Sequence, residues 1–270
     1  KGIATHYYIS PQIWAWKEGR IKAIKNDVDH MYVILPFEKD FYENKHQYPV
    51  HFVGHPLIDA IDQKNDTNEQ EFRKEFNLDQ RPIVALLPGS RKQEIEKMLS
   101  VMLSVIQDFP DYQFVIAGAP SQDKEFYEKF ITSEQVHFIT NRTYDLLSIS
   151  HAALVTSGTA TLETALFKVP EVVLYKGNEI SYQIAKRVLT LKYISLVNLI
   201  MDETVVTELI QNDCNTKRVT EELNKILDEN HRKTLINKYN LVEEKLGGKG
   251  ASLKTAEFIT KSVAQSKKKE

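Results

Sequence analysis

The chain has 270 residues, of which 42% are hydrophobic and 27% are charged, a composition typical of a globular protein with one large or two modest domains. The formal net charge of −2 gives no electrostatic reason to expect a nucleic-acid partner, and the single cysteine, Cys214, excludes an internal disulfide bond. No apolar run reaches the roughly 18 residues that a membrane-spanning helix needs. With only one cysteine, we expect a protein of the reducing cytoplasm.

Short apolar runs that predict β-strands alternate with helical patterns along most of the chain. The predicted strands are residues 6–9, 30–35, 50–53, 83–87, 113–117, 136–139, 152–155 and 171–174. The predicted helices are residues 14–26, 69–76, 93–107, 124–131, 143–150 and 161–167, followed by 217–226, 231–246 and 252–262 with no strand between them. Continuous apolar strands alternating with helices predict an α/β fold of parallel β-α-β units, with helices on both faces of the sheets.

Two features of the first 68 residues bear on domain organisation. Residues 63–68 are polar and lack apolar anchors, which predicts a linker or an exposed loop, and we place a domain change near Gly54-His55-Pro56. The chain begins at Lys1 rather than Met, although residues 7–9 already read as part of a strand. We therefore expect it to be a segment of a longer protein.

The predicted helix at residues 14–26 has a mixed character, because it carries basic residues beside two tryptophans and two isoleucines. This pattern fits an amphipathic helix packed on a core, which we favour, and it also fits an element that lies on a membrane surface. The basic residues of this segment are Lys17, Arg20, Lys22 and Lys25.

The first candidate site is the turn "PGSR", residues 88–91, where a predicted strand meets a predicted helix. Gly89 lets the backbone approach a ligand, and Ser90 is predicted to be the N-cap, with Gln93 as its capping-box partner. The free N–H groups and the dipole of a helix start attract anions, and Arg91 adds a fork of donors suited to phosphate oxygens. The turn is therefore either a phosphate site or a capped turn with an exposed arginine.

The second candidate site is the segment "SGTATLE", residues 157–163, again between a strand and a helix. Ser157, Gly158 and Thr159 form a turn of small residues. Glu163 either accepts hydrogen bonds from ribose hydroxyls or only stabilises the helix dipole. Because open α/β sheets bind ligands at the carboxyl ends of their strands, we expect the two turns to share a ligand. Neither has the spacing of a dinucleotide fingerprint or a P-loop, which disfavours those generic sites.

Five motifs occur in order along the chain: "YYISPQIWAWKEGRIKAIKNDVDHMYVILPFEKDFYE", "FVGHPLID", "LLPGSRKQEI", "SGTATLETAL" and "KYISLVNLIMDETVVTELIQ". Together they resemble the lipid-A-disaccharide synthase family over residues 7–259. The resemblance implies a GT-B fold, in which two Rossmann-like domains face each other and the C-terminal one holds the nucleotide. The implied domains are residues 1–55 (the C-terminal remnant of the N-terminal, acceptor-side Rossmann-like domain), 56–246 (the UDP-sugar-binding Rossmann-like domain) and 247–270 (a C-terminal helix and tail).

The resemblance also implies a reaction of lipid A biosynthesis in Gram-negative bacteria. A 2,3-diacylglucosamine moves from UDP to 2,3-diacylglucosamine 1-phosphate, which gives the β-1,6-linked lipid A disaccharide 1-phosphate and UDP. Arg91 and the two helix starts are expected to stabilise the charge that grows on UDP as the C1–O bond breaks. The implied nucleotide-binding residues are Gly89, Ser90, Arg91, Ser157, Gly158, Thr159, Ala160, Glu163, Asn198, Glu208 and Gln211.

The sequence also leads to expectations about cofactors, partners and transferase activity. No metal or cofactor is expected, because no Asp-x-Asp stands at a strand end and the eight histidines form no ligand cluster. Both implied substrates are acylated, so peripheral association with the inner membrane is expected, and the family resemblance favours a homodimer. The family's proposed catalytic base would precede Lys1, so we expect little or no transferase activity from these residues alone. Two alternatives stay open: a UDP-binding module without activity of its own, and a UDP-sugar 2-epimerase of GT-B type.

Overall fold

The computed structural model of the chain describes residues 3–177 and 192–266. Its contacts divide the described residues into two compact units, one with residues 3–64 and 241–266, the other with residues 65–177 and 192–240. The first unit therefore combines segments from both ends of the chain. The domain boundaries placed after residues 55 and 246 stay predictions, and residues 267–270 of the expected tail lie outside the described residues.

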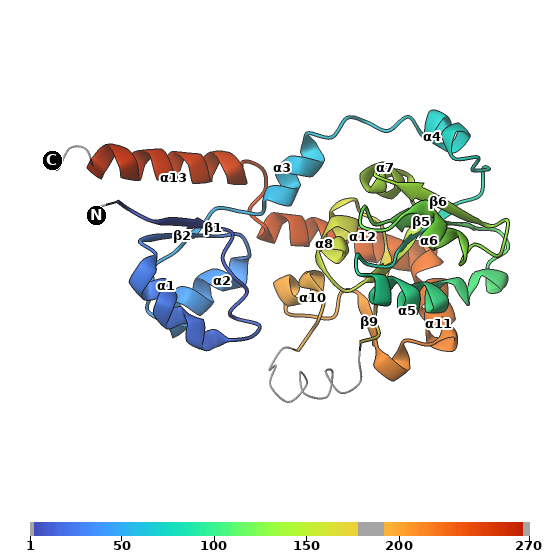
Figure 1. Ribbon diagram of the computed structural model, residues 1–270, viewed down its shortest axis with the longest axis horizontal. Helices are drawn as coiled ribbons and strands as arrows, with labels where there is room; N and C mark the ends of the chain where they lie inside the picture. The colour runs from blue at the N-terminus through green and yellow to red at the C-terminus, as the bar shows by residue number, and fades with distance from the viewer. Residues whose placement is uncertain (1–2, 178–191, 267–270) are drawn as a thin grey trace. The chain divides into compact units, whose positions relative to one another are not determined.

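The first unit is built on a three-stranded parallel sheet in the order β1-β2-β3, of which Figure 1 labels β1 and β2. Its strands are β1 (His6–Tyr8), β2 (His30–Val33) and β3 (His51–Phe52). Its helices are α1 (Ile21–Asp27), α2 (Pro36–Asp40), α3 (Pro56–Asp62) and α13 (Ala251–Ser266), with a π-turn at Phe41–Lys45. Met31 and Val33 of β2 pack with Ile21 and Ile24 of α1 in a buried cluster.

Helix α13 packs on the opposite face of this sheet. Successive side chains of a strand point to opposite faces, so His30 and Tyr32 point away from Met31 and Val33. The ring of Phe258 stacks on His51 with centroids 4.4 Å apart, and Ser262 Oγ lies 3.0 Å from His30 Nε2. Asp59 of α3 accepts hydrogen bonds from the backbone N–H groups of Gly250 and Ser252, at 2.6 and 3.2 Å, where α13 begins. The C-terminal helix is thus held by both α3 and the sheet.

The predicted helix at residues 14–26 is wrong in its extent. The structure has a 3₁₀ turn, Glu18–Arg20, followed by α1, which begins at Ile21. Lys17 adopts the left-handed conformation with φ 56°, which an α-helix of L-residues does not contain, so the residues before it fold separately. Trp14 Nε1 donates to Glu38 at 3.1 Å, whereas Trp16 is exposed.

The second unit contains a six-stranded parallel sheet in the order β6-β5-β4-β7-β8-β9. Its strands are β4 (Ile83–Leu87), β5 (Gln113–Gly118), β6 (Val136–Thr140), β7 (Ala152–Thr156), β8 (Glu171–Tyr175) and β9 (Thr207–Ile210). All eight predicted strands of the chain are present with small shifts at their ends, and β9 is an additional edge strand. The predicted α/β class with parallel sheets is confirmed.

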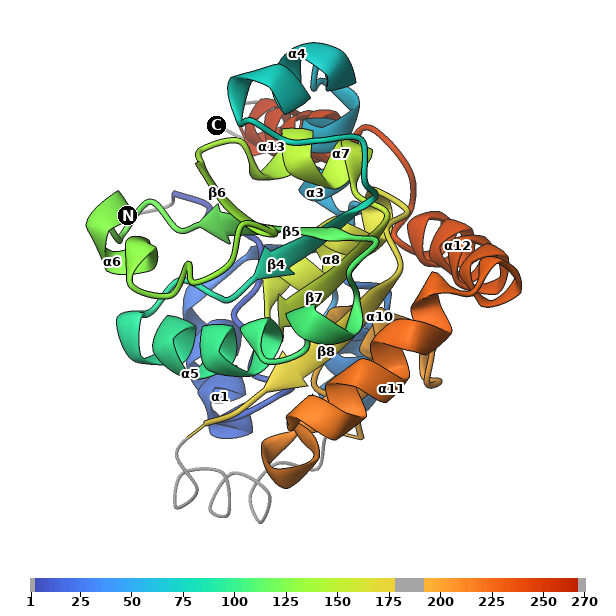
Figure 2. The same cartoon turned by 90° about the vertical axis from the view of Figure 1, so that its right-hand side faces the viewer.

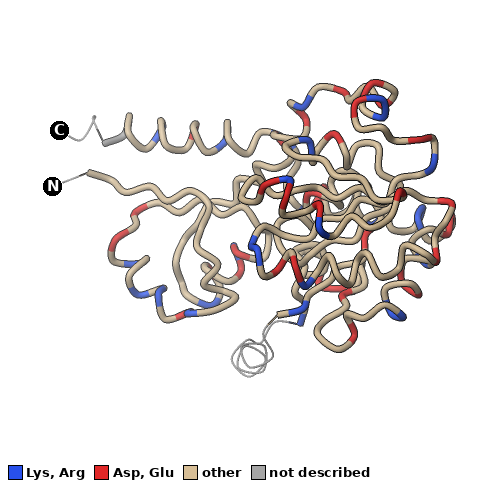
Figure 3. The backbone as a smooth tube through the Cα atoms, turned by 45° about the vertical axis from the view of Figure 1, so that its right-hand side comes forward, with Lys and Arg blue, Asp and Glu red and all other residues tan. Residues whose placement is uncertain are grey.

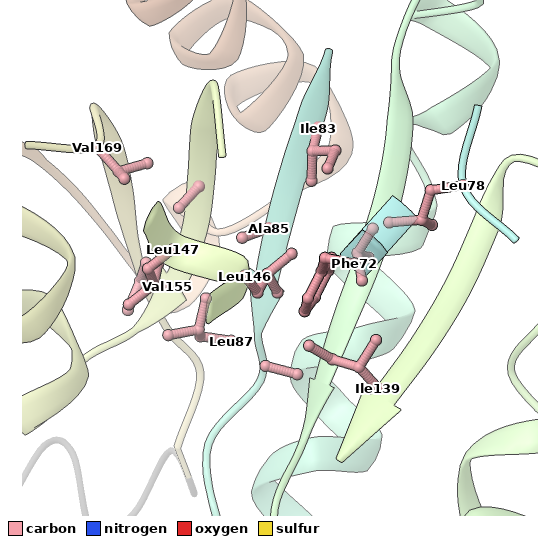
Figure 4. Close-up of a cluster of buried hydrophobic side chains, with 13 residues drawn as sticks. Phe72, Leu78, Ile83, Ala85, Leu87, Ile139, Leu146, Leu147, Val155 and Val169 are labelled. Atoms are coloured by element: carbon pink, nitrogen blue, oxygen red, sulfur yellow. The ribbon is translucent and has the colours of Figure 1, made fainter. Parts of the chain in front are cut away.

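Helices cover both faces of the larger sheet: α4 (Glu69–Glu75) and α7 (Thr143–Ile149) lie on one side, and α5 (Lys92–Leu103) and α11 (Thr216–Leu227) lie on the other (Figure 2). Ile83 and Ala85 of β4 pack with Phe72 of α4 and with Leu146 and Leu147 of α7, all of them buried (Figure 4). The other helical segments are α6 (Lys124–Glu128), α8 (Thr159–Leu166), α10 (Leu196–Met201), α12 (Glu229–Lys245) and two 3₁₀ turns, Ile106–Asp108 and Gln211–Asp213.

Acidic and basic residues are interspersed along the backbone, as Figure 3 shows, in keeping with the formal charge of −2. Across the described ranges, none of the helices combines the length and the apolar character required to cross a membrane.

Candidate functional site

The two predicted turns leave the same edge of the larger sheet at neighbouring positions. From β4 the chain builds β5 and β6 on one side, and from β7 it builds β8 and β9 on the other, so the strand order reverses between β4 and β7. These two strands pair in parallel with Leu87 opposite Val155. An open α/β sheet has a crevice at the carboxyl ends of its strands where the order reverses, and ligands bind there.

Residues of both turns line one cavity of about 360 Å³ at this position. Its wall also includes Gly118, the last residue of β5, Pro120 in the loop that follows, and Thr143, the first residue of α7. The structure therefore brings the two turns together, as the sequence predicted. The predicted site residues that line this cavity, which we call the two-turn cavity, are Gly89, Ser90, Ser157, Gly158, Thr159, Ala160 and Glu163.

The second turn presents backbone rather than side chains to the two-turn cavity. Gly158 is the N-cap residue of α8, and no protein atom lies within 4 Å of the position that a Cβ would take there. The backbone of Gly158 is extended, with φ 161°, so its conformation does not require glycine. The Thr161 N–H donates to the Gly158 carbonyl at 3.2 Å, whereas the N–H groups of the first two residues of α8 have no acceptor within the helix. The missing side chain leaves open space beside these donors.

The first turn differs from the prediction in its capping. Helix α5 begins at Lys92, so Arg91 is the N-cap residue, and no side chain caps the helix. The predicted capping box of Ser90 and Gln93 is therefore wrong. The N-cap lies one residue after Ser90, so the third residue of the helix is Glu94 rather than Gln93. Glu94 Oε2 accepts a hydrogen bond from the Ser90 N–H at 3.3 Å. Gly89 has φ 99°, a conformation that favours glycine, and a Cβ there would force the side chain of Glu94 to move.

Glu163 is oriented by a neighbour on α7. The Tyr144 hydroxyl donates to Glu163 Oε1 at 2.8 Å. Burial, and then the hydrogen bond to this carboxylate, raise the pKa of Tyr144, so the phenol stays protonated and remains a donor. One carboxylate oxygen of Glu163 is thereby held at the wall of the two-turn cavity by Tyr144, which the sequence did not single out.

Thr156, the last residue of β7, is a second residue that the sequence analysis missed. Its side chain is 4% exposed, and its Oγ1 has no hydrogen-bond partner among the described residues. It lines the two-turn cavity and also a neighbouring cavity of about 470 Å³. Buried hydroxyls are usually hydrogen-bonded, so an orphan hydroxyl at a cavity wall is a ready partner for a ligand. A polar residue ending the apolar run "AALVT" was the available signal.

Arg91 lines the neighbouring cavity instead of the two-turn cavity. The two cavities share Glu94 and Thr156 as wall residues, so Arg91 stands beside the position that the sequence predicted for it.

Asn198, Glu208 and Gln211 line neither of these two cavities. The amide of Asn198 makes four hydrogen bonds at 2.8–2.9 Å, to Glu208 Oε1 and to backbone groups of residues 205 and 206, and the side chain is fully buried. Glu208 also accepts from the N–H groups of residues 194 and 195, and Gln211 Oε1 accepts from the Gly177 N–H at 2.7 Å. The Ser157 hydroxyl donates to the carbonyl of residue 194 at 3.0 Å, which connects this network to the second turn.

Residues 3–177 and 192–266 contain no group of three or more His, Cys, Asp and Glu side chains that could hold a metal ion. The expectation of a metal-free site stays a prediction.

Comparisons with known proteins identify the same family that the sequence motifs resemble. The sequence profile of the family described as lipid-A-disaccharide synthetase matches residues 2–262. A lipid-A-disaccharide synthase of Coxiella burnetii (strain CbuG_Q212) is 40% identical over 264 residues, covering 96% of this chain and 69% of the relative. One from Trichlorobacter lovleyi is 37% identical over 273 residues, covering 98% of this chain and 70% of the relative.

Among solved structures, UDP-GlcNAc 2-epimerase from Neisseria meningitidis bound to UDP-GlcNAc is similar, with a TM-score of 0.60 and 15% identity, covering 97% of this chain and 69% of that one. At this identity the likeness shows the fold alone, which is of the GT-B class. The match over nearly the whole sequence decides the family, and the chain belongs to the lipid-A-disaccharide synthetase family.

Proposed function

We propose that this chain carries the donor-nucleotide site of a hexosyltransferase of lipid A biosynthesis. The reaction moves 2,3-diacylglucosamine from UDP to 2,3-diacylglucosamine 1-phosphate and gives lipid A disaccharide 1-phosphate and UDP. The observation that supports this proposal is that both glycine-containing turns line the same cavity of about 360 Å³, at the point where the strand order reverses. The chain also belongs to this family.

The diphosphate of UDP would lie against the two turns. The N-terminus of α8 supplies backbone donors and the positive end of the helix dipole, and Gly158 leaves the space that a phosphate needs. The orphan hydroxyl of Thr156 adds a donor at the cavity floor. Glu163, held through one oxygen by Tyr144, would accept a hydrogen bond from a ribose hydroxyl.

Departure of UDP leaves negative charge on the oxygen released from C1, while the 6-hydroxyl of the acceptor forms the new C1–O bond and loses its proton. Arg91 lines the adjoining cavity and would stabilise this charge from there. A preorganised donor of this kind typically contributes about 2.7–4 kcal/mol. In this proposal no metal is needed. Asn198, Glu208 and Gln211 act by holding residues 194–211 beside the second turn.

Titration calorimetry with UDP tests the site, and an assay with both lipid substrates tests the reaction. UDP binding with turnover supports the hexosyltransferase, and UDP binding without turnover leaves a nucleotide-binding module, the second candidate. Failure to bind UDP overturns both. The alternative of a UDP-sugar 2-epimerase is supported only by structural similarity. It would require that the protein converts UDP-N-acetylglucosamine to its 2-epimer.

Peripheral membrane association follows from the acyl chains of both proposed substrates. Charge reversal at the four basic residues of the 17–25 segment should weaken co-sedimentation with anionic vesicles if this segment contributes. Equal binding by the wild type and the variant would remove the segment from the proposal. The homodimer stays a prediction that light scattering can test.

A further inference from the structure

A second cavity adjoins the two-turn cavity along helix α5. It has a volume of about 470 Å³ and shares Glu94 and Thr156 with the two-turn cavity. A third cavity of about 500 Å³ continues along the same helix and shares Lys97 and Lys176 with the second. The three cavities thus form a row that begins at the proposed diphosphate position.

The second cavity, which we call the cationic cavity, is rich in positive charge. The described residues of its wall include one carboxylate, Glu94, and four cations, Arg91, Lys92, Lys97 and Lys176. Glu94 already accepts a hydrogen bond from the backbone of the first turn. The excess of cations therefore favours an anionic ligand.

Among the described residues, three of these four cations have no ion-pair or aromatic partner. None of the ion pairs formed by the described residues includes Arg91, Lys97 or Lys176. Lys92 differs, because its ammonium lies 5.8 Å from the centre of the Phe126 ring. In the third cavity the acid Glu96 is paired with Lys129 at 3.3 Å, so it does not neutralise Lys97 or Lys176 either.

The backbone that carries these cations is fixed by the core. Ile95, Met98 and Leu99 of α5 are fully buried, which sets the rotation of the helix. Arg91 precedes this helix, and Lys97 stands next to the buried Met98, so both positions are determined by packing. Lys176 directly follows β8. Because the backbone is already fixed, ligand binding has to order only the side chains of these cations.

We infer that the cationic cavity binds a phosphate monoester, the 1-phosphate of the acceptor sugar, while the two-turn cavity holds the donor diphosphate; this inference rests on the proposed function. A phosphate monoester carries a charge of about −1.5 to −2 near pH 7. Lysine binds phosphate as a point charge, and arginine binds it through a fork of donors. Two adjoining anion sites would hold the two phosphorylated substrates next to each other, with the acceptor anchored through its phosphate while its 6-hydroxyl approaches C1 of the donor.

The rival source of the same chemistry is the donor, whose diphosphate could reach into the cationic cavity. Glucosamine 1-phosphate is a soluble probe that separates the two sources, because it carries the monoester without acyl chains or uridine. The acceptor assignment predicts that the wild-type chain saturated with UDP still binds this probe, and that unphosphorylated glucosamine binds much more weakly.

The variants for this test are Lys97→Met and Lys176→Met, which keep the length of the side chain and remove its charge. Each should weaken binding of glucosamine 1-phosphate about tenfold, since a hydrogen bond to a charged group is lost, while UDP affinity changes less than about twofold. Lys217→Met, at an exposed position of α11 outside both cavities, is the matched control and should change neither.

Four results overturn the inference: no binding of the probe to the wild type, competition between the probe and UDP, probe binding that ignores both lysine variants, or equal losses for UDP and the probe. In each case intact UDP binding by the wild type would leave the proposed function standing. Absence of UDP binding by the wild type would instead defeat the proposed function itself.

Discussion

Gly158 offers the sharpest test of the two-turn cavity at the scale of single residues. A methyl group at this position meets no protein atom within 4 Å, and the extended backbone accepts any residue. Gly158→Ala should therefore leave the free energy of unfolding unchanged or raise it by about 0.4–1 kcal/mol. If the open space belongs to a phosphate, calorimetry should show UDP affinity reduced about ten- to hundredfold, the cost of overpacking by about 1–3 kcal/mol.

Gly19→Ala is the control, because a Cβ at Gly19 also meets no atom within 4 Å and this residue lies in the other unit. Equal UDP affinity in Gly158→Ala and the wild type would show that the space beside the α8 N-terminus is not used by the nucleotide.

The pair of Tyr144 and Glu163 provides a graded test of ribose recognition. Glu163→Gln removes the charge that a ribose hydroxyl would meet and should weaken UDP about tenfold or more, as expected for a hydrogen bond to a charged group. Tyr144→Phe removes only the 2.8 Å hydrogen bond that orients the acid, so a smaller loss is expected. Titration with UDP and with uridine-free diphosphate separates the effects, since the latter should bind both variants and the wild type alike. A larger loss in Tyr144→Phe than in Glu163→Gln would reverse the assigned roles.

Arg91 makes a kinetic prediction. Arg91→Ala in a full-length enzyme should lower turnover about a hundredfold or more. The reason is that loss of a preorganised donor raises the free energy of the transition state by about 2.7–4 kcal/mol. Unchanged kcat together with unchanged UDP affinity would exclude the proposed role of Arg91 beside the leaving group.

Among the elements, helix α3 depends on a histidine cap. Nδ1 of the His55 ring accepts a hydrogen bond from the Leu57 N–H at 3.2 Å. The backbone N–H of His55 donates to the carbonyl of Leu246 at 3.1 Å. Burial lowers the pKa of His55 from 6.5 to about 4. The neutral ring is the form that can accept, so protonation breaks the cap.

The pH dependence follows from this lowered pKa. Between pH 6.5 and 4 the unfolded chain binds a proton at His55 and the folded chain does not, so stability is complete above 6.5 and falls as pH decreases. The total loss is roughly 3 kcal/mol. His55→Asn keeps an N-cap acceptor without titrating, and denaturant unfolding at several pH values should show a shallower acid decline for this variant. Parallel declines in the wild type and His55→Asn would rule out His55 as the cause.

The elements that the sequence predicted well are those with a strong local pattern. Strands β4, β5 and β7 are continuous apolar runs, so their existence and parallel pairing follow from composition and order. Strand β9 was missed because its four residues, "TELI", are at a sheet edge and include Glu208, whose charge is accommodated by a network formed only in the fold. The prediction of one helix over residues 14–26 was wrong because Lys17 adopts the left-handed conformation and interrupts it.

At the scale of the whole molecule, a buried acid in the larger sheet makes stability depend on pH in the opposite direction. Glu171 begins β8, is fully buried, and its carboxyl oxygens have no hydrogen-bond partner within the described ranges. Burial raises the pKa of Glu171 well above its usual value of 4.5. Above pH 4.5 the unfolded chain releases this proton while the folded chain keeps it, so stability falls as pH rises through this window.

Glu171→Gln should remove that decline. Relative to the variant, the wild type should lose up to about 1.4 kcal/mol of unfolding free energy per pH unit above 4.5, until the folded-state pKa is reached. Denaturant unfolding from pH 4.5 to 8 measures the difference, and Glu244→Gln, at an exposed position of α12, is the control. A wild-type-to-variant difference that does not change with pH would show that Glu171 ionises equally in both states.

By itself the sequence determined the α/β class, the parallel strands, the two turns and the family, because each of these depends on short-range patterns or on motifs read in order. Only the tertiary structure decided which residues share a cavity. It separated Arg91 from the two-turn cavity, engaged Asn198 and Glu208 in a buried network, and left the hydroxyl of Thr156 without a partner at the cavity wall. The physical reason is that a side chain's neighbours come from strand register and helix packing, which join residues far apart in the chain.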